Sequence, residues 1–190
     1  MFKNVKSYFA LIILTPIIAG IYGILHDQIT YTISSEYFTN FKFIQFNIGY
    51  FFTESKRFAV GLVGFLATWW VGIPIGIILG LQGIKSLDSK QYIKQKIKAI
   101  RIVFITAIIF GFIGYISFLI YIYFMGDWPI NIGGRISNPE LAEAFSQIKN
   151  IRNFLSVGFI HNFSYFGGAA GLLIASIFQY RNTKKLSHFL

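Results

Sequence analysis

Four long apolar segments alternate with polar segments along the chain, and this alternation is the main structural signal in the sequence. The apolar segments cover about residues 8–25, 58–81, 102–125 and 153–178. A helix needs roughly 20 mainly apolar residues to cross a bilayer, and each segment comes near or exceeds that length. We therefore predict an all-α membrane protein, a four-transmembrane-helix bundle that forms one domain over residues 1–190.

The polar segments predict the orientation of this bundle. Residues 82–101 form a basic loop with one acid, Asp88, against six Lys and Arg residues. This loop and the two chain ends carry eleven of the seventeen Lys and Arg residues, which the positive-inside rule places in the cytoplasm. The segments 26–57 and 126–152 are then outer loops. We expect a multi-pass protein of the bacterial inner membrane with both termini cytoplasmic.

The first outer loop is long for a simple connection and rich in phenylalanine and tyrosine. Aromatic side chains favour the headgroup level of a bilayer. The loop therefore predicts an ordered, aromatic extracytoplasmic cap on the bundle. Within it, residues 29–34 alternate apolar or aromatic side chains with hydroxyl side chains, which is typical of a strand, so the cap could contain a short β-hairpin.

Two polar segments carry signals for the start of a helix. Asp88 and Gln91, three positions apart, resemble a capping box, so the third long helix should begin near Ser89. Asn138 followed by Pro139 is a second start signal, because Asn caps well and proline fits the first helical position. It predicts a short helix that precedes the fourth membrane segment.

The composition agrees with a membrane protein and narrows its partners. The chain is 55% hydrophobic and 13% charged, whereas soluble domains carry roughly 25% charged residues. It has no cysteine, which excludes disulfides and thiolate chemistry. The net charge of +10 comes largely from residues that flank the apolar segments. We expect contacts with the lipid bilayer, with anionic lipids at the basic loop, and no nucleic-acid binding.

Small residues mark two of the predicted helices as packing surfaces. Glycine recurs every fourth position at Gly72, Gly76 and Gly80 in the second segment, and at Gly167 and Gly171 in the fourth. Glycines four apart lie on one helix face and let another backbone approach closely. These faces can pack within the bundle, against a second copy of the chain, or against another membrane protein.

The candidate chemistry rests on four ionisable residues, His26, Asp27, Glu36 and His161. Such residues are scarce here, since the chain has only three histidines and seven carboxylate side chains. Two imidazoles with one or two carboxylates suit zinc or iron(II), so the set predicts a divalent-metal site near the outer side. Further polar groups would complete the pocket: Tyr37, Asn162, Ser164 and Tyr165.

Spacing alone does not bring these residues together. His26 and Asp27 are adjacent, and adjacent side chains on a helix point apart, so a shared site predicts a non-helical backbone there. His161 lies nine residues past Arg152, about 13 Å along a helix axis. It meets His26 only if the cap or helix kinks bring the two to a similar depth.

These residues leave three functions open. A metal at the site could polarise a substrate or activate water in membrane-linked catalysis. Alternatively, the histidines and carboxylates relay protons in a small transporter or channel subunit, or the protein is a structural subunit of a membrane complex. Whether it is an enzyme stays undecided, because the G-x-S-x-G, Walker A and G-x-G-x-x-G motifs are all absent from the sequence.

Several motifs resemble a family of small bacterial four-helix inner-membrane proteins. The motifs are His26-Asp27-Gln28, Glu36-Tyr37-Phe38-Thr39, Phe41-Lys42-Phe43 and His161-Asn162, and the similarity covers most of the chain. The resemblance implies the four-helix architecture. It implies no activity, cofactor or substrate.

Overall fold

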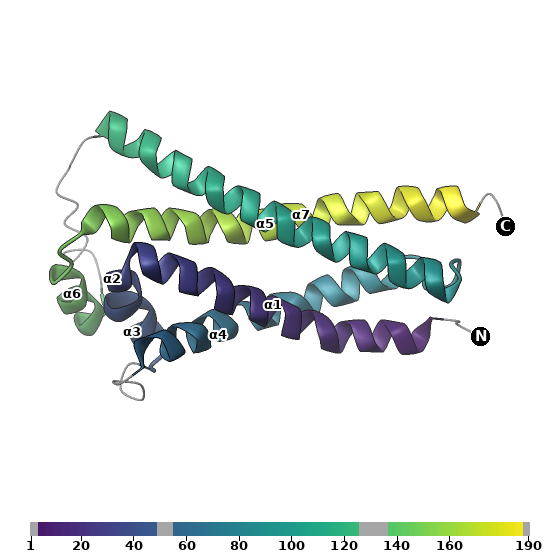
Figure 1. Ribbon diagram of the computed structural model, residues 1–190, viewed down its shortest axis with the longest axis horizontal. Helices are drawn as coiled ribbons and strands as arrows, with labels where there is room; N and C mark the ends of the chain where they lie inside the picture. Colours follow the sequence, from purple (N-terminus) through teal and green to yellow (C-terminus); the bar gives the residue numbers. More distant parts are fainter. Residues whose placement is uncertain (1–3, 49–54, 126–136, 188–190) are drawn as a thin grey trace.

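The computed structural model describes residues 4–48, 55–125 and 137–187, and the regular elements in these ranges are all helices. Four of them are long: α1 (Val5–Ile33), α4 (Lys56–Leu81), α5 (Ser89–Met125) and α7 (Ile151–Ser187) (Figure 1). Each is long and apolar enough to cross a membrane. The chain is therefore a multi-pass membrane protein with four spanning helices.

The long helices form two antiparallel pairs (Figure 1). α1 packs mainly against α4, and α5 mainly against α7, while fewer contacts join one pair to the other. Both termini lie at one end of the bundle. The short helices gather at the other end, called the cap end below: α2 (Ser35–Tyr37), η1 (Phe38–Lys42), α3 (Phe43–Gln45) and α6 (Pro139–Ser146).

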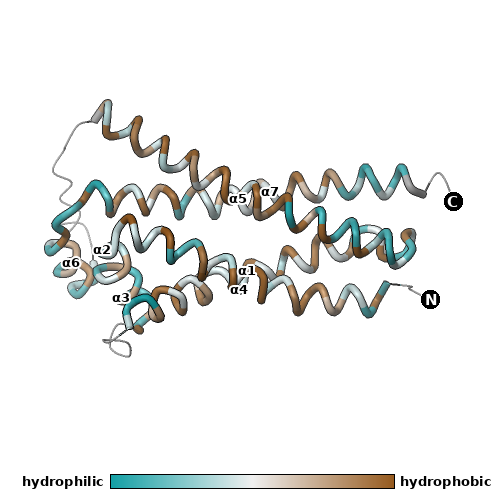
Figure 2. The backbone as a smooth tube through the Cα atoms, viewed as in Figure 1, coloured by the Kyte–Doolittle hydropathy of each residue, from teal (hydrophilic) through white to brown (hydrophobic). Residues whose placement is uncertain are grey.

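Apolar residues follow the long helices, and hydrophilic segments concentrate at the two ends of the bundle (Figure 2). The large side chains on the outside of the long helices are mostly isoleucine, leucine and phenylalanine. In a spanning bundle these side chains face lipid tails, so their exposure needs no protein partner. α1 continues beyond its predicted apolar segment to Ile33, so the first predicted outer loop is partly helical.

Glycines set the closest approach within the α1–α4 pair. A Cβ on Gly64 would overlap the backbone of Gly23, and a Cβ on Gly23 would overlap the backbone of Gly64. The predicted packing glycines of α4 lie farther along the same contact. Added Cβ atoms on Gly72, Gly76 and Gly80 would meet Pro16, Thr15 and Tyr8 of α1, respectively. This face of α4 is therefore occupied by α1.

Glycines also set the closest approach within the α5–α7 pair. A Cβ on Gly167 would meet Phe110 of α5, and a Cβ on Gly171 would meet Val103. Small residues on α7 thus let α5 approach closely, as expected for helices that associate in lipid. The two predicted glycine faces pack inside this chain.

The predicted strand at residues 29–34 is wrong, because α1 continues without a break to Ile33, and the described residues contain no strand that could form a hairpin. The hydroxyls that suggested a strand are satisfied within the helix. Thr30 Oγ1 donates to the His26 carbonyl at 3.2 Å, and Thr32 Oγ1 donates to the Gln28 carbonyl at 2.9 Å. Threonine can bond to a carbonyl one turn back, which removes the cost of its hydroxyl in an apolar helix.

Both predicted helix starts are confirmed. α5 begins at Ser89, and Asp88 Oδ1 accepts a hydrogen bond from the Gln91 backbone N–H at 2.9 Å. α6 begins at Pro139, and Asn138 Oδ1 accepts from the Leu141 N–H at 3.2 Å. Each cap satisfies a backbone donor that the first helical turn leaves unpaired.

The cap end is aromatic, as predicted, and it is packed rather than extended. Tyr37, Phe38 and Phe43 are buried against Val60 of α4 and Phe154 of α7. The cap thereby joins the two helix pairs. Parts of the predicted outer loops, residues 49–54 and 126–136, lie outside the described residues.

Candidate metal centre

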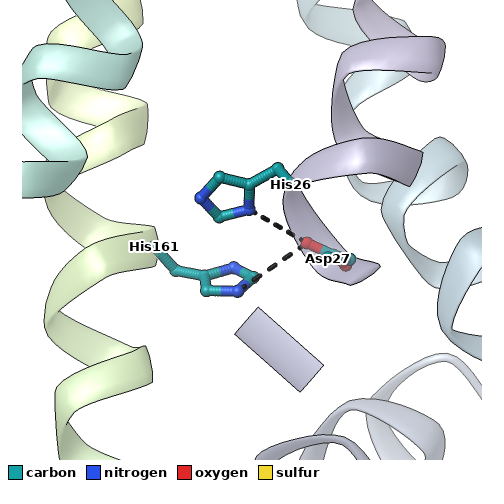
Figure 3. Close-up of side chains that lie close together, drawn as sticks. All are labelled: His26, Asp27 and His161. Carbon is teal, nitrogen blue, oxygen red and sulfur yellow. Dashed lines mark hydrogen bonds and ion pairs between the residues drawn. The ribbon is translucent and has the colours of Figure 1, made fainter. Parts of the chain in front are cut away.

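Two spanning helices bring three ionisable side chains together near the cap end. His26 and Asp27 come from α1, and His161 comes from α7 (Figure 3). Asp27 Oδ1 lies 3.1 Å from His26 Nδ1 and 3.7 Å from His161 Nε2. Asp27 and His161 are each only 3% exposed. The contact therefore joins the two helix pairs through a buried polar group.

The backbone at His26 and Asp27 is helical, contrary to the expectation from their adjacency. The Asp27 side chain faces the bundle interior, and the His26 ring lies at the edge of the same face. The ring reaches back to the neighbouring carboxylate through Nδ1. These two adjacent helical residues therefore share one site, because the His26 imidazole is long enough for its Nδ1 to reach the Asp27 carboxylate.

Two hydroxyl groups complete the polar cluster. Thr30 Oγ1 lies 3.1 Å from His161 Nε2, and Ser164 Oγ lies 3.4 Å from His26 Nε2. Because Thr30 donates its proton to backbone carbonyls of α1, its oxygen is available to accept from the His161 ring. Asp27, His26 and Ser164 form a continuous chain of carboxylate, imidazole and hydroxyl.

Aromatic side chains of the cap cover His161. The ring centroids of Tyr37 and Phe38 lie 5.1 Å and 6.1 Å from that of His161. Both aromatic residues are buried. The cap therefore separates this histidine from the space beyond the bundle end, which strengthens electrostatic interactions at the site.

A buried lysine lies in the same cap. Lys42 Nζ donates to Gln45 Oε1 at 3.0 Å and lies 5.1 Å from the centroid of the Phe41 ring. Burial lowers the pKa of Lys42, and the nearby Asp27 carboxylate opposes part of that shift. The five-residue π-helix η1 ends at Lys42, and such segments often occur at functional sites.

The three donors fit a metal ion. One ligand atom from each of His26, Asp27 and His161 can be chosen so that all lie within 4.8 Å of one another. The second carboxylate oxygen of Asp27, Oδ2, is buried and has no hydrogen-bond partner in the described ranges. Two imidazoles and a carboxylate form a donor set suited to zinc or iron(II). A bound cation would also satisfy the unpaired oxygen.

The structure does not bring Glu36 to this group. Its Oε1 accepts from the Lys149 backbone N–H and its Oε2 from the Asn150 N–H, both at 2.9 Å. These donors immediately precede α7, so Glu36 fastens α2 to the start of that helix. Its carboxylate replaces part of the hydrogen bonding that a helix start lacks.

The other predicted pocket residues divide into two groups. Tyr37 and Ser164 contact the histidines, as described above, and Tyr165 lines a small cavity of about 60 Å³ beside them. That cavity lies where all four long helices meet. Asn162 is exposed and lies apart from the cluster. Thr30 was not among the predicted residues, although its position three and four residues after Asp27 and His26 places it on the same helix face.

Comparisons with protein-family models, with curated proteins and with solved structures give no match to this chain. They therefore identify no family. The fold and site define a class: a multi-pass membrane protein with a buried His-Asp-His group that can hold a metal.

Proposed function

We propose that His26, Asp27 and His161 bind one divalent metal ion, zinc or iron(II), in a site that serves membrane-linked catalysis. The observation that carries the proposal is the buried cluster of three donors, in which one carboxylate oxygen has no hydrogen-bond partner within the described part of the chain. Ionisable residues within membrane helices are costly and usually functional. A three-ligand set also leaves a coordination position for water or substrate.

When bound, the metal would supply Lewis-acid chemistry, polarising a substrate oxygen or lowering the pKa of water. The protein residues have separate roles. Before a metal binds, Asp27 orients the His26 ring through Nδ1, and Thr30 orients the His161 ring through Nε2; each ring would bind the metal through a nitrogen that carries no proton. Ser164 places a hydroxyl on the other nitrogen of His26, where it can hold or accept a proton. The aromatic cap limits water at His161.

Elemental analysis by mass spectrometry of detergent-purified protein tests this proposal. Wild type, His161→Ala and Asn162→Ala would be loaded with zinc or iron(II) and desalted. We expect about one metal per chain in wild type and in Asn162→Ala, whose exposed side chain is the matched control, and loss of metal in His161→Ala. The Asp27→Asn variant, which keeps the side-chain shape, should lose metal too. Wild type without metal would overturn the proposal; pH-dependent flux in liposomes would then favour transport.

The chain Asp27–His26–Ser164 favours a second candidate, a serine nucleophile. Hydroxyl, imidazole and carboxylate in this order activate serine in hydrolases on unrelated folds. Here Ser164 Oγ would attack an ester carbonyl while His26 Nε2 takes its proton and later passes it to the leaving alcohol. A fluorophosphonate probe should label wild type and the Asn162→Ala control but not Ser164→Ala. An unlabelled wild type would exclude this candidate.

A further inference from the structure

An apolar groove on the side of the bundle leads to the candidate metal centre. It lies between α1 and α5, with α7 behind it, and has a volume of about 560 Å³. Its walls are built mainly from Leu25, Ile29, Ile33, Ile108, Phe112 and Tyr115. Leu25, Ile29 and Phe112 are 61%, 66% and 68% exposed, so the groove opens outward rather than into the bundle.

The inner surface of this groove is polar at one place. His26 and Ser164, whose Nε2 and Oγ lie 3.4 Å apart, both line it, and Thr30 lies beside them. His26 and Ser164 also line the small interior cavity, together with Asp27 and His161. The two spaces therefore meet at His26. A molecule in the groove can touch this histidine without entering through the aromatic cap.

The surroundings of the groove decide what can occupy it. Because its walls belong to spanning helices, the open side of the groove faces the lipid tails of the bilayer. A water-soluble substrate would have to lose its hydration to enter from that side, whereas the apolar chain of a lipid would not. The polar end of such a molecule would need hydrogen-bond partners, and His26 and Ser164 supply them.

The depth of His26 matches the polar end of a lipid. Gln28, two residues or about 3 Å of helix rise closer to the cap end, bonds through Oε1 to the Arg57 guanidinium at 3.1 Å. Arginine near a helix end reaches towards the headgroup level. His26 therefore lies just below that level, where the ester and phosphate linkages of a lipid join its chains.

We propose that the groove between α1 and α5 binds an acyl chain of a membrane lipid and presents the lipid's ester or phosphate linkage to His26 and Ser164. This inference rests on the proposed function, for which it names the substrate class. The lipid would approach laterally from the bilayer.

Photocrosslinking can test the groove independently of metal binding. The full-length protein would be placed in vesicles of phosphatidylethanolamine and phosphatidylglycerol in equal amounts, doped with phosphatidylethanolamine that carries a diazirine on one acyl chain. Mass spectrometry would locate the cross-links. We expect them to concentrate at least about five-fold on Leu25, Ile29 and Phe112, relative to Ile21 and Ile109, which are also exposed but do not line the groove.

Matched substitutions sharpen the test. Ile108→Trp should fill the groove and remove most of its cross-links, whereas Ile109→Trp, on the next position of the same helix, should leave them unchanged. If Ile108→Trp does not fold, Ile29→Trp with Ile21→Trp as its control makes the same comparison from α1. Cross-links spread evenly over all exposed apolar residues would overturn the inference.

Metal content measured on the same samples separates the two proposals. Groove-specific cross-links on protein that binds no metal would support the lipid site and contradict the metal centre. Metal-loaded protein with evenly spread cross-links would retain the metal centre and contradict the lipid site.

Discussion

The imidazole rings of His26 and His161 lie 4.6 Å apart, centroid to centroid, and meet nearly edge-on at 80°. These residues come from the first and last spanning helices, which belong to different helix pairs. Asp27 Oδ1 faces both rings. The site therefore depends on how the two pairs dock.

Zinc should stabilise wild type and not Asp27→Asn. A ligand that binds only the folded state at 100 times its dissociation constant adds about 2.7 kcal/mol. Removing the Asp27 charge should weaken zinc binding by more than about 100-fold, since even partners that merely orient a ligand contribute about 10- to 100-fold. Thermal unfolding in detergent with and without zinc measures this. Equal zinc-induced shifts in the two proteins would contradict a site at Asp27.

The stability of wild type should rise as the pH increases from neutral to about 9, which is below the ordinary pKa values of both tyrosine and lysine. Burial lowers the pKa of Lys42 in the folded protein, so the unfolded chain binds more protons in this window, and stability then increases with pH. Tyr37 opposes the trend only near and above the ordinary tyrosine pKa of 10, because burial raises its pKa in the folded protein and the unfolded chain then loses this proton first. Lys42→Met should make the rise in melting temperature smaller. Parallel pH profiles for the two proteins would show that Lys42 is not the cause.

Glu36→Gln should destabilise the protein without removing metal. Its carboxylate accepts two backbone hydrogen bonds before α7, and a neutral amide can keep only part of that interaction. We expect a loss of about 1 kcal/mol, the usual contribution of one hydrogen bond. Chemical unfolding gives the stability, and elemental analysis gives the metal content. Loss of metal in a folded Glu36→Gln variant would instead indicate that Glu36 is a metal ligand.

Gly64→Ala and Gly168→Ala should have opposite effects. Both glycines are helical, and replacing helical glycine by alanine favours the helix by about 1 kcal/mol. Among the residues that the structure describes, a Cβ on Gly168 meets nothing within 4 Å, so this variant should be more stable. A Cβ on Gly64 overlaps the backbone of α1, and overpacking typically costs about 1–3 kcal/mol or more. Thermal unfolding of both variants checks the sign, and a stable Gly64→Ala would contradict the close α1–α4 contact.

Both termini should be cytoplasmic, with the cap on the outer side. Figure 1 shows the termini together at the end opposite the cap, so a cap on the cytoplasmic side of the membrane would contradict the prediction. The chain has no native cysteine, which makes single-cysteine labelling direct. Lys90→Cys near the start of α5 should resist a membrane-impermeant maleimide in intact cells, and Glu140→Cys in α6 should react.

The sequence by itself determined the four spanning helices and the starts of α5 and α6. Length, hydropathy and capping are local properties, and a bilayer requires backbone polar groups to be satisfied within each helix. The aromatic nature of the cap also followed from composition. The strand predicted at residues 29–34 is wrong because a period-two pattern of threonines is compatible with a helix in which each hydroxyl bonds back one turn.

Only the tertiary structure decided which polar residues meet. His26, Asp27 and His161 converge because the glycine contacts of α1 with α4, and of α7 with α5, set the depth and rotation of each helix. In the sequence, Glu36 and Asp27 were equal candidates for the metal site, yet the Glu36 carboxylate accepts a backbone hydrogen bond just before α7. The physical reason is that interhelical register depends on contacts between distant segments, which hydropathy and local spacing do not encode.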